Sequence, residues 1–135
     1  MSLDDWILAL HLLSAFALVG AMVVLWFGYL VLRADGAAPA GLGRLFTVGS
    51  IAVGIGLAGT LVFGVWLSIS LDGYEPWDGW VLAALVLWAI AGGTGDRAGR
   101  LSREPGGVQR ALVLHTVSSL AIVLILIDMI WKPGA

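Results

Sequence analysis

Residues 45–71 read LFTVGSIAVGIGLAGTLVFGVWLSISL, and no charged side chain interrupts this stretch between Arg44 and Asp72. About 20 consecutive apolar residues are enough for an α-helix to cross the hydrocarbon core of a bilayer. Backbone amides in hydrocarbon must find their hydrogen bonds within the protein, and a helix satisfies them internally. The stretch therefore predicts a membrane-spanning helix.

Three further charge-poor stretches have the same character, at residues 6–32, 79–95 and 111–131. All four prolines lie outside these stretches, as helices require, because an internal proline removes a backbone hydrogen bond. The sequence lacks the alternating polarity over about ten residues that is typical of transmembrane β-strands. It therefore predicts an all-α membrane protein, a single domain in which four transmembrane helices form a bundle.

The composition agrees with this fold class. The chain has 135 residues, of which 60% are hydrophobic and 12% charged, and its mean hydropathy is +1.00. Soluble domains average about 45–50% apolar and about 25% charged residues, and a short soluble chain keeps much of its surface in water. A soluble globular enzyme is thereby excluded. The absence of cysteine excludes disulfides and thiolate metal sites.

The few charges are unequally distributed between the connecting segments. Residues 33–44 and 96–110 together carry six arginines and three acidic residues, whereas the remainder of the chain carries six acidic residues and one lysine. Cytoplasmic loops of membrane proteins are enriched in arginine and lysine. We therefore predict that both termini lie outside and that both arginine-rich loops are cytoplasmic. An aromatic belt at the outer interface then accounts for five tryptophans: Trp6, Trp66, Trp77, Trp80 and Trp131.

Small residues recur at helical spacing in the stretch 45–71. Two neighbouring rows repeat every four residues, Ser50, Gly54 and Ala58, and Ala52, Gly56, Thr60 and Gly64. Helices in lipid associate through close backbone contact at small residues. Packing within one chain explains such rows, and an interface between copies of the chain in a homo-oligomer is the alternative.

Three ionisable residues lie within the predicted spans, where such residues are functional candidates. Two of them are His11, near the outer end of the first span, and His115, near the inner end of the fourth. Each is either hydrogen-bonded to a neighbouring helix or a haem ligand. Because the two lie near opposite membrane faces, their depths should differ by about 15 Å in a hydrocarbon core of about 30 Å. We therefore expect that they do not bind the same haem within one chain.

Asp128 is the third ionisable residue, and Lys132 follows it by one helical turn. A carboxylate four residues before a lysine is the favourable order for a helical ion pair. We therefore predict an interfacial pair of Asp128 and Lys132. The alternative is a contact between Asp128 and His11, which share a leaflet, and such a contact would hold the imidazole in one tautomer.

Three motifs carry a resemblance to a known family. They are Leu10-His11 followed by Ser14 and Gly20, the segment GYEPWDGW at 73–80, and the segment MIWKPG at 129–134. Over nearly its whole length the chain resembles DUF2269, a family of small, uncharacterised integral membrane proteins. The resemblance implies four helices and a multi-pass protein of the bacterial inner membrane, and it implies no activity.

A looser resemblance is confined to the first span. It is similar to the first helix of the copper-resistance D family and of the HemJ-type protoporphyrinogen oxidases. In both families a histidine lies early in the first membrane helix. The resemblance to the HemJ type implies that His11 is a haem ligand. The rest of the HemJ pattern has no counterpart in this sequence.

The predicted function is that of a small membrane protein with no enzymatic activity of its own. It would serve in the lipid bilayer as an accessory or scaffold subunit, as a homo-oligomer or in a membrane complex. The alternatives are a haem-binding redox protein that uses His11 and a transporter of small solutes or ions. The transporter is disfavoured because no proline breaks a span and few polar groups lie at the midplane. No motif indicates nucleic-acid binding or a catalytic loop.

Overall fold

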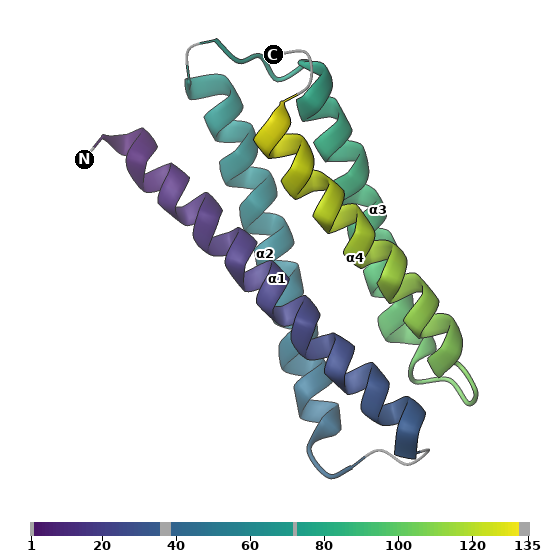
Figure 1. Cartoon of the computed structure of the whole chain (residues 1–135). Coiled ribbons are helices and arrows are strands. Elements are labelled where there is room, and N and C mark those ends of the chain that lie inside the picture. Colours follow the sequence, from purple (N-terminus) through teal and green to yellow (C-terminus); the bar gives the residue numbers. More distant parts are fainter. Residues whose placement is uncertain (1, 36–38, 72, 133–135) are drawn as a thin grey trace.

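The structure is a computed structural model that describes residues 2–35, 39–71 and 73–132 (Figure 1). Within these residues the chain forms only helices: α1 (Leu3–Asp35), α2 (Leu42–Ser70), α3 (Gly79–Leu101) and α4 (Val108–Trp131). The four helices confirm the predicted fold class. Each is long and apolar enough to cross a bilayer, as in a multi-pass membrane protein.

The helices extend beyond the charge-free stretches that predict them. The largest difference is at α3, which continues past the predicted end at Gly95 to Leu101. Asp96 and Arg100 lie one turn apart on this extension, and their side chains form an exposed salt bridge of 2.6 Å. Charged side chains on a helix surface require water or lipid headgroups. The last turns of α3 therefore belong to the membrane interface, which a search for uncharged residues misses.

The helices form two antiparallel hairpins, α1–α2 and α3–α4, and the two helices of each hairpin pack extensively on each other. The hairpins contact each other less, through α1 against α4 and α2 against α3. Figure 1 shows α1 crossing in front of α2, with the start of α1 splayed away from α4. The start of α1 and the end of α4 lie at one end of the bundle, called here the terminal end. The opposite end, which carries the six arginines, is called the arginine end.

Glycines of α2 determine how closely α1 and α2 pack. A methyl group added at Gly56 would lie 2.7 Å from Cβ of Leu18 and 2.9 Å from Cα of the same residue. One added at Gly49 would lie 2.7 Å from Cδ2 of Leu25. Small residues at these points let the two backbones approach, which is how helices associate in lipid.

The two predicted rows of small residues have different surroundings. Gly56 and Gly64 in one row face α1, so packing within the chain explains that row. Ser50, Gly54 and Ala58 in the other row are exposed. A methyl group added at Gly54 would meet nothing within 4 Å. Packing within the chain therefore leaves the second row unexplained.

Two layers of buried side chains fill the bundle. The middle layer consists of Leu18, Met22, Ala91, Ala121 and Ile122. The second layer, nearer the arginine end, consists of Leu25, Tyr29, Ala98, Ala111 and Leu112. Many large apolar side chains remain exposed on the outside of the helices, as expected where lipid is the solvent. Cavities lie on both sides of the middle layer.

Candidate functional site

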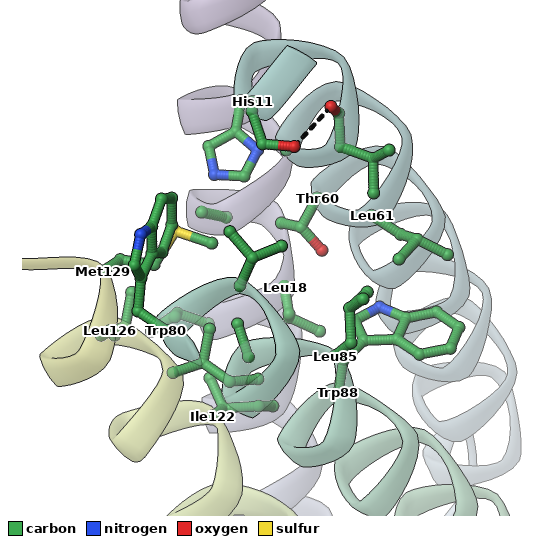
Figure 2. Close-up of a pocket in the computed structure, with 18 residues that line it drawn as sticks. His11, Leu18, Thr60, Leu61, Trp80, Leu85, Trp88, Ile122, Leu126 and Met129 are labelled. Atoms are coloured by element: carbon green, nitrogen blue, oxygen red, sulfur yellow. Dashed lines mark hydrogen bonds between the residues drawn. The ribbon is translucent and has the colours of Figure 1, made fainter. Parts of the chain in front are cut away.

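The terminal half of the bundle encloses a cavity to which all four helices contribute (Figure 2). Its volume is about 80 Å³. Most of its wall is apolar and includes Leu18, Leu85, Ile122, Leu126 and Met129. We call it the terminal cavity, and it contains the first of the two histidines singled out in the sequence.

His11 lies in the wall that α1 contributes to the terminal cavity. The residue is 9% exposed, and its Nδ1 is buried without a partner at hydrogen-bond geometry, although the imidazole lies near the main chain of Thr60. A methyl group added at Gly64 of α2 would lie 3.1 Å from Cε1 of His11 and 3.4 Å from Nδ1. The absence of a side chain at Gly64 therefore lets the imidazole lie against the α2 backbone.

Trp80, in the first turn of α3, also lines the terminal cavity. It is 7% exposed, and its indole Nε1 is likewise buried without a partner. The sequence assigns Trp80 to the aromatic belt and so misses its place in the cavity. The available signal is the four-residue spacing of Trp80, Ala84 and Trp88, which places them on one helix face. Trp88 differs in one respect, because its Nε1 donates a 2.9 Å hydrogen bond to the main-chain oxygen of Leu57.

Lys132, the residue that follows α4, contacts the aromatic rings of Tyr74 and Trp80. Its Nζ donates a 2.7 Å hydrogen bond to Oη of Tyr74. Nζ also lies 4.1 Å from the ring centroid of Tyr74 and 5.5 Å from that of Trp80, within the range of cation–π contacts. The two rings meet edge to face, with centroids 5.5 Å apart. These contacts form an aromatic cap beside the terminal cavity.

The ion pair expected between Asp128 and Lys132 is not formed. Lys132 has a left-handed backbone, with φ of 41°, so it leaves the helical path and its side chain turns to Tyr74 instead. Oδ2 of Asp128 is buried without a hydrogen-bond partner, as is Nδ1 of His11, so the alternative contact is not a hydrogen bond between these atoms. In the described parts of the chain, the three buried side-chain atoms without a partner belong to His11, Trp80 and Asp128.

His115 lies in the other half of the bundle, within an aromatic network. Its Nε2 is 3.2 Å from the main-chain oxygen of Met22 on α1. Its ring centroid is 5.1 Å from that of Trp26 and 4.9 Å from that of Tyr29. Nε1 of Trp26 donates to Oγ of Ser119, which in turn donates to the main-chain oxygen of His115. His115 therefore links α4 to α1.

A haem does not fit the terminal cavity beside His11. Ligand pockets usually measure about 300–1,000 Å³, whereas the terminal cavity has about 80 Å³. His115 lines a different cavity, and its Nε2 must carry the proton in the hydrogen bond to the Met22 oxygen, because a carbonyl only accepts. Of the two ring nitrogens of His115, Nδ1 alone then keeps a lone pair that could bind a metal. The described residues also contain no group of three or more histidines and carboxylates that could hold a metal ion.

Comparison with known proteins identifies no relative: no family model, no curated protein and no solved structure matches the chain. The cavities and surfaces of the bundle are therefore the basis for inferring its function.

Proposed function

We propose that the protein is an accessory membrane subunit that binds a small lipophilic molecule in the terminal cavity. The supporting observation is that Nδ1 of His11 and Nε1 of Trp80, from different helices, are unpartnered in residues that line the same apolar cavity. A buried polar group without a partner costs about 1–3 kcal/mol. A bound molecule that supplies a partner would recover this cost.

The two unpartnered atoms define the chemistry of the ligand. An indole N–H only donates, whereas an imidazole nitrogen donates or accepts according to its tautomer. The ligand therefore needs a hydrogen-bond acceptor, such as a carbonyl oxygen, for Trp80. The apolar wall and the volume of about 80 Å³ restrict its enclosed part to a few atoms that include the acceptor, since a cavity of about 150 Å³ is what takes up a benzene ring. The remainder of the ligand would lie in the open mouth of the cavity. Trp88 cannot serve as the donor, because its N–H is already bonded to Leu57.

Acetophenone, a small aryl ketone with one acceptor, is a suitable probe for the full chain in detergent micelles. We expect it to shift the indole ¹⁵N–H resonance of Trp80 downfield and to leave that of Trp88 in place. Trp80→Phe should weaken acetophenone binding about fivefold, the effect of losing one hydrogen bond of about 1 kcal/mol. Trp88→Phe is the matched control, because its N–H makes no contact with the ligand.

Ethylbenzene provides the corresponding control on the side of the ligand. It has nearly the shape of acetophenone but lacks the acceptor, so it should bind without shifting the Trp80 N–H resonance downfield. If the Trp80 resonance does not respond to acetophenone, or responds equally to both compounds, the proposed function is wrong. Equal losses of binding in Trp80→Phe and Trp88→Phe would contradict the role of Trp80.

We also propose that both termini lie outside the cytoplasm, in a bacterial inner membrane as the resemblance to DUF2269 implies. The support is that all six arginines belong to one end of the bundle, whereas the start of α1 and the end of α4 lie at the other. Because the chain has no cysteine, single cysteines report the two sides directly. In intact cells a membrane-impermeant maleimide should label Ser2→Cys and spare Glu104→Cys. If the maleimide labelled Glu104→Cys alone, the orientation would be the opposite of the one proposed.

A competing proposal concerns assembly: the subunit forms a homo-oligomer or joins a membrane complex through α2, and a helix docked on this face would exclude any other molecule from it. It is supported by the row of Ser50, Gly54 and Ala58, which is exposed in the bundle. Exposed small residues allow another helix to approach closely. The transporter alternative has less support, because a transporter needs a path between the two membrane faces. The middle layer of buried side chains, which includes Leu18 and Ile122, lies between the cavities of the two halves.

A further inference from the structure

A groove runs between α2 and α3 in the arginine half of the bundle. It consists of a cavity of about 340 Å³ and an adjoining one of about 400 Å³. Both are lined by Ser50, Gly99 and Arg103, so we treat them as one feature, the arginine groove. Each volume falls within the range of about 300–1,000 Å³ that is usual for ligand sites.

Glycines keep the arginine groove open. Its α3 wall contains Gly92, Gly95 and Gly99, and its α2 wall contains Gly54. A methyl group added at Gly54 or at Gly99 would meet nothing within 4 Å. The space beside Gly54 and Gly99 is therefore free of protein atoms, whereas a methyl group at Gly92 would lie 3.6 Å from Cδ1 of Leu57. The lining is mixed, with apolar side chains such as Leu25 and Ile122 beside polar ones such as Ser118 and the paired Asp96 and Arg100. A hydrocarbon chain would lie along the apolar part.

Hydrogen-bond donors lie at one end of the groove. Arg103 lines both cavities, and the single salt bridge among the described side chains joins Arg100 to Asp96, so it does not engage Arg103. Tyr29 lines one cavity and Ser102 the other. The Ser102 hydroxyl already donates a 2.9 Å hydrogen bond to the main-chain oxygen of Gly99. The guanidinium of Arg103 is therefore the donor group available to a phosphate, which a guanidinium can bind through two parallel hydrogen bonds.

We propose that the arginine groove binds an anionic phospholipid, with the phosphate at Arg103 and one acyl chain between the glycine walls of α2 and α3. Basic pockets between transmembrane helices bind acidic lipid headgroups, and arginines near a membrane surface attract anionic lipid. A free phosphate would pair with Arg103 but leave the glycine walls empty. A helix of a second copy would fill the walls but leave Arg103 without an anion. Only a lipid accounts for both features.

Native mass spectrometry tests whether the groove selects an anionic headgroup. The full chain is purified in the presence of phosphatidylglycerol or of phosphatidylcholine with the same acyl chains, and the lipid that stays bound is measured. We expect the wild type to retain phosphatidylglycerol in preference to phosphatidylcholine. Arg103→Gln should reduce this preference about fivefold, the effect of removing one cationic contact near the surface. Arg97→Gln is the matched control and should keep the preference, because Arg97 lines a pocket on α3 outside the groove.

Leucines in the glycine walls test the site of the acyl chain. At Gly99 and at Gly54 an added Cβ would meet nothing within 4 Å, so Gly99→Leu and Gly54→Leu each start a side chain in open space of the groove. Either variant should abolish phosphatidylglycerol retention. Gly93→Leu, equally unobstructed but outside the groove, should retain the lipid. Using both walls keeps the test valid if circular dichroism shows that one variant is unfolded.

Three results would overturn the proposal. If the leucine variants retain phosphatidylglycerol as the wild type does, the acyl chain does not lie in the groove. If millimolar inorganic phosphate displaces the bound species, the ligand is a free anion. If Gly99→Leu converts a dimer into a monomer with unchanged lipid, the groove holds a second copy of the chain. None of these results depends on the terminal cavity or on the side of the membrane that the arginine end faces.

Discussion

Gly56→Leu should disrupt the α1–α2 hairpin. A Cβ at this position would lie 2.7 Å from Cβ of Leu18 and 2.9 Å from its backbone nitrogen and Cα. Backbone atoms cannot rotate away as a flexible side chain can, so the two helices would have to separate. Overpacking a well-packed interior costs about 1–3 kcal/mol. We expect a loss of at least about 3 kcal/mol, because leucine adds three further carbon atoms beyond the clashing Cβ.

Gly54→Leu is the matched control, because it makes the same change on the same helix. Two residues along a helix correspond to a rotation of about 200°, and the space around Gly54 is open to 4 Å. Unfolding by sodium dodecyl sulfate, followed by circular dichroism in mixed micelles, measures both losses of stability. We expect Gly54→Leu to stay within about 0.5 kcal/mol of the wild type. Equal losses would mean that Gly56 does not determine the spacing of the hairpin.

The helices could be predicted from the sequence because uncharged length decides whether a segment can cross a bilayer. The end of α3 could not, because the helix continues through Asp96 and Arg100, which pair with each other at the interface. The inward-facing row of α2 could not be identified either. Both rows consist of small residues with the same four-residue period, and only the position of α1 distinguishes Gly56 from Gly54.

The candidate site likewise has features that the sequence predicts and features that depend on the neighbouring helices. Leu10-His11 and Leu114-His115 are each followed by a serine three residues after the histidine, so local sequence suggests similar roles for both. Their difference arises from the neighbouring helices, because α1 surrounds His115 with aromatic rings and accepts its hydrogen bond, whereas Nδ1 of His11 has no hydrogen-bond partner. For Lys132, the helical register predicts a partner at Asp128. The left-handed backbone at Lys132 is a local feature that this register does not reveal.

His115→Ala should therefore destabilise the bundle much more than His11→Ala. The change at position 115 removes the hydrogen bond to the Met22 oxygen and leaves a gap between the rings of Trp26 and Tyr29. Replacing a large buried aromatic residue by alanine costs about 3–5 kcal/mol in soluble proteins. Lipid removes the water-transfer part of that cost but not the loss of packing. We therefore expect a loss of about 2–4 kcal/mol for His115→Ala.

His11 is the natural comparison, because the two histidines are similarly buried, at 9% and 3% exposed. His11→Ala removes a buried Nδ1 that has no hydrogen-bond partner and enlarges a cavity that already exists. We expect it to cost less than about 1 kcal/mol in the same unfolding experiment on ligand-free protein. His115→Phe separates the two contributions at position 115, because it restores the ring contacts without the hydrogen bond. If both alanine variants lose the same stability, His115 is not the structural link between α1 and α4 and the two histidines are equivalent after all.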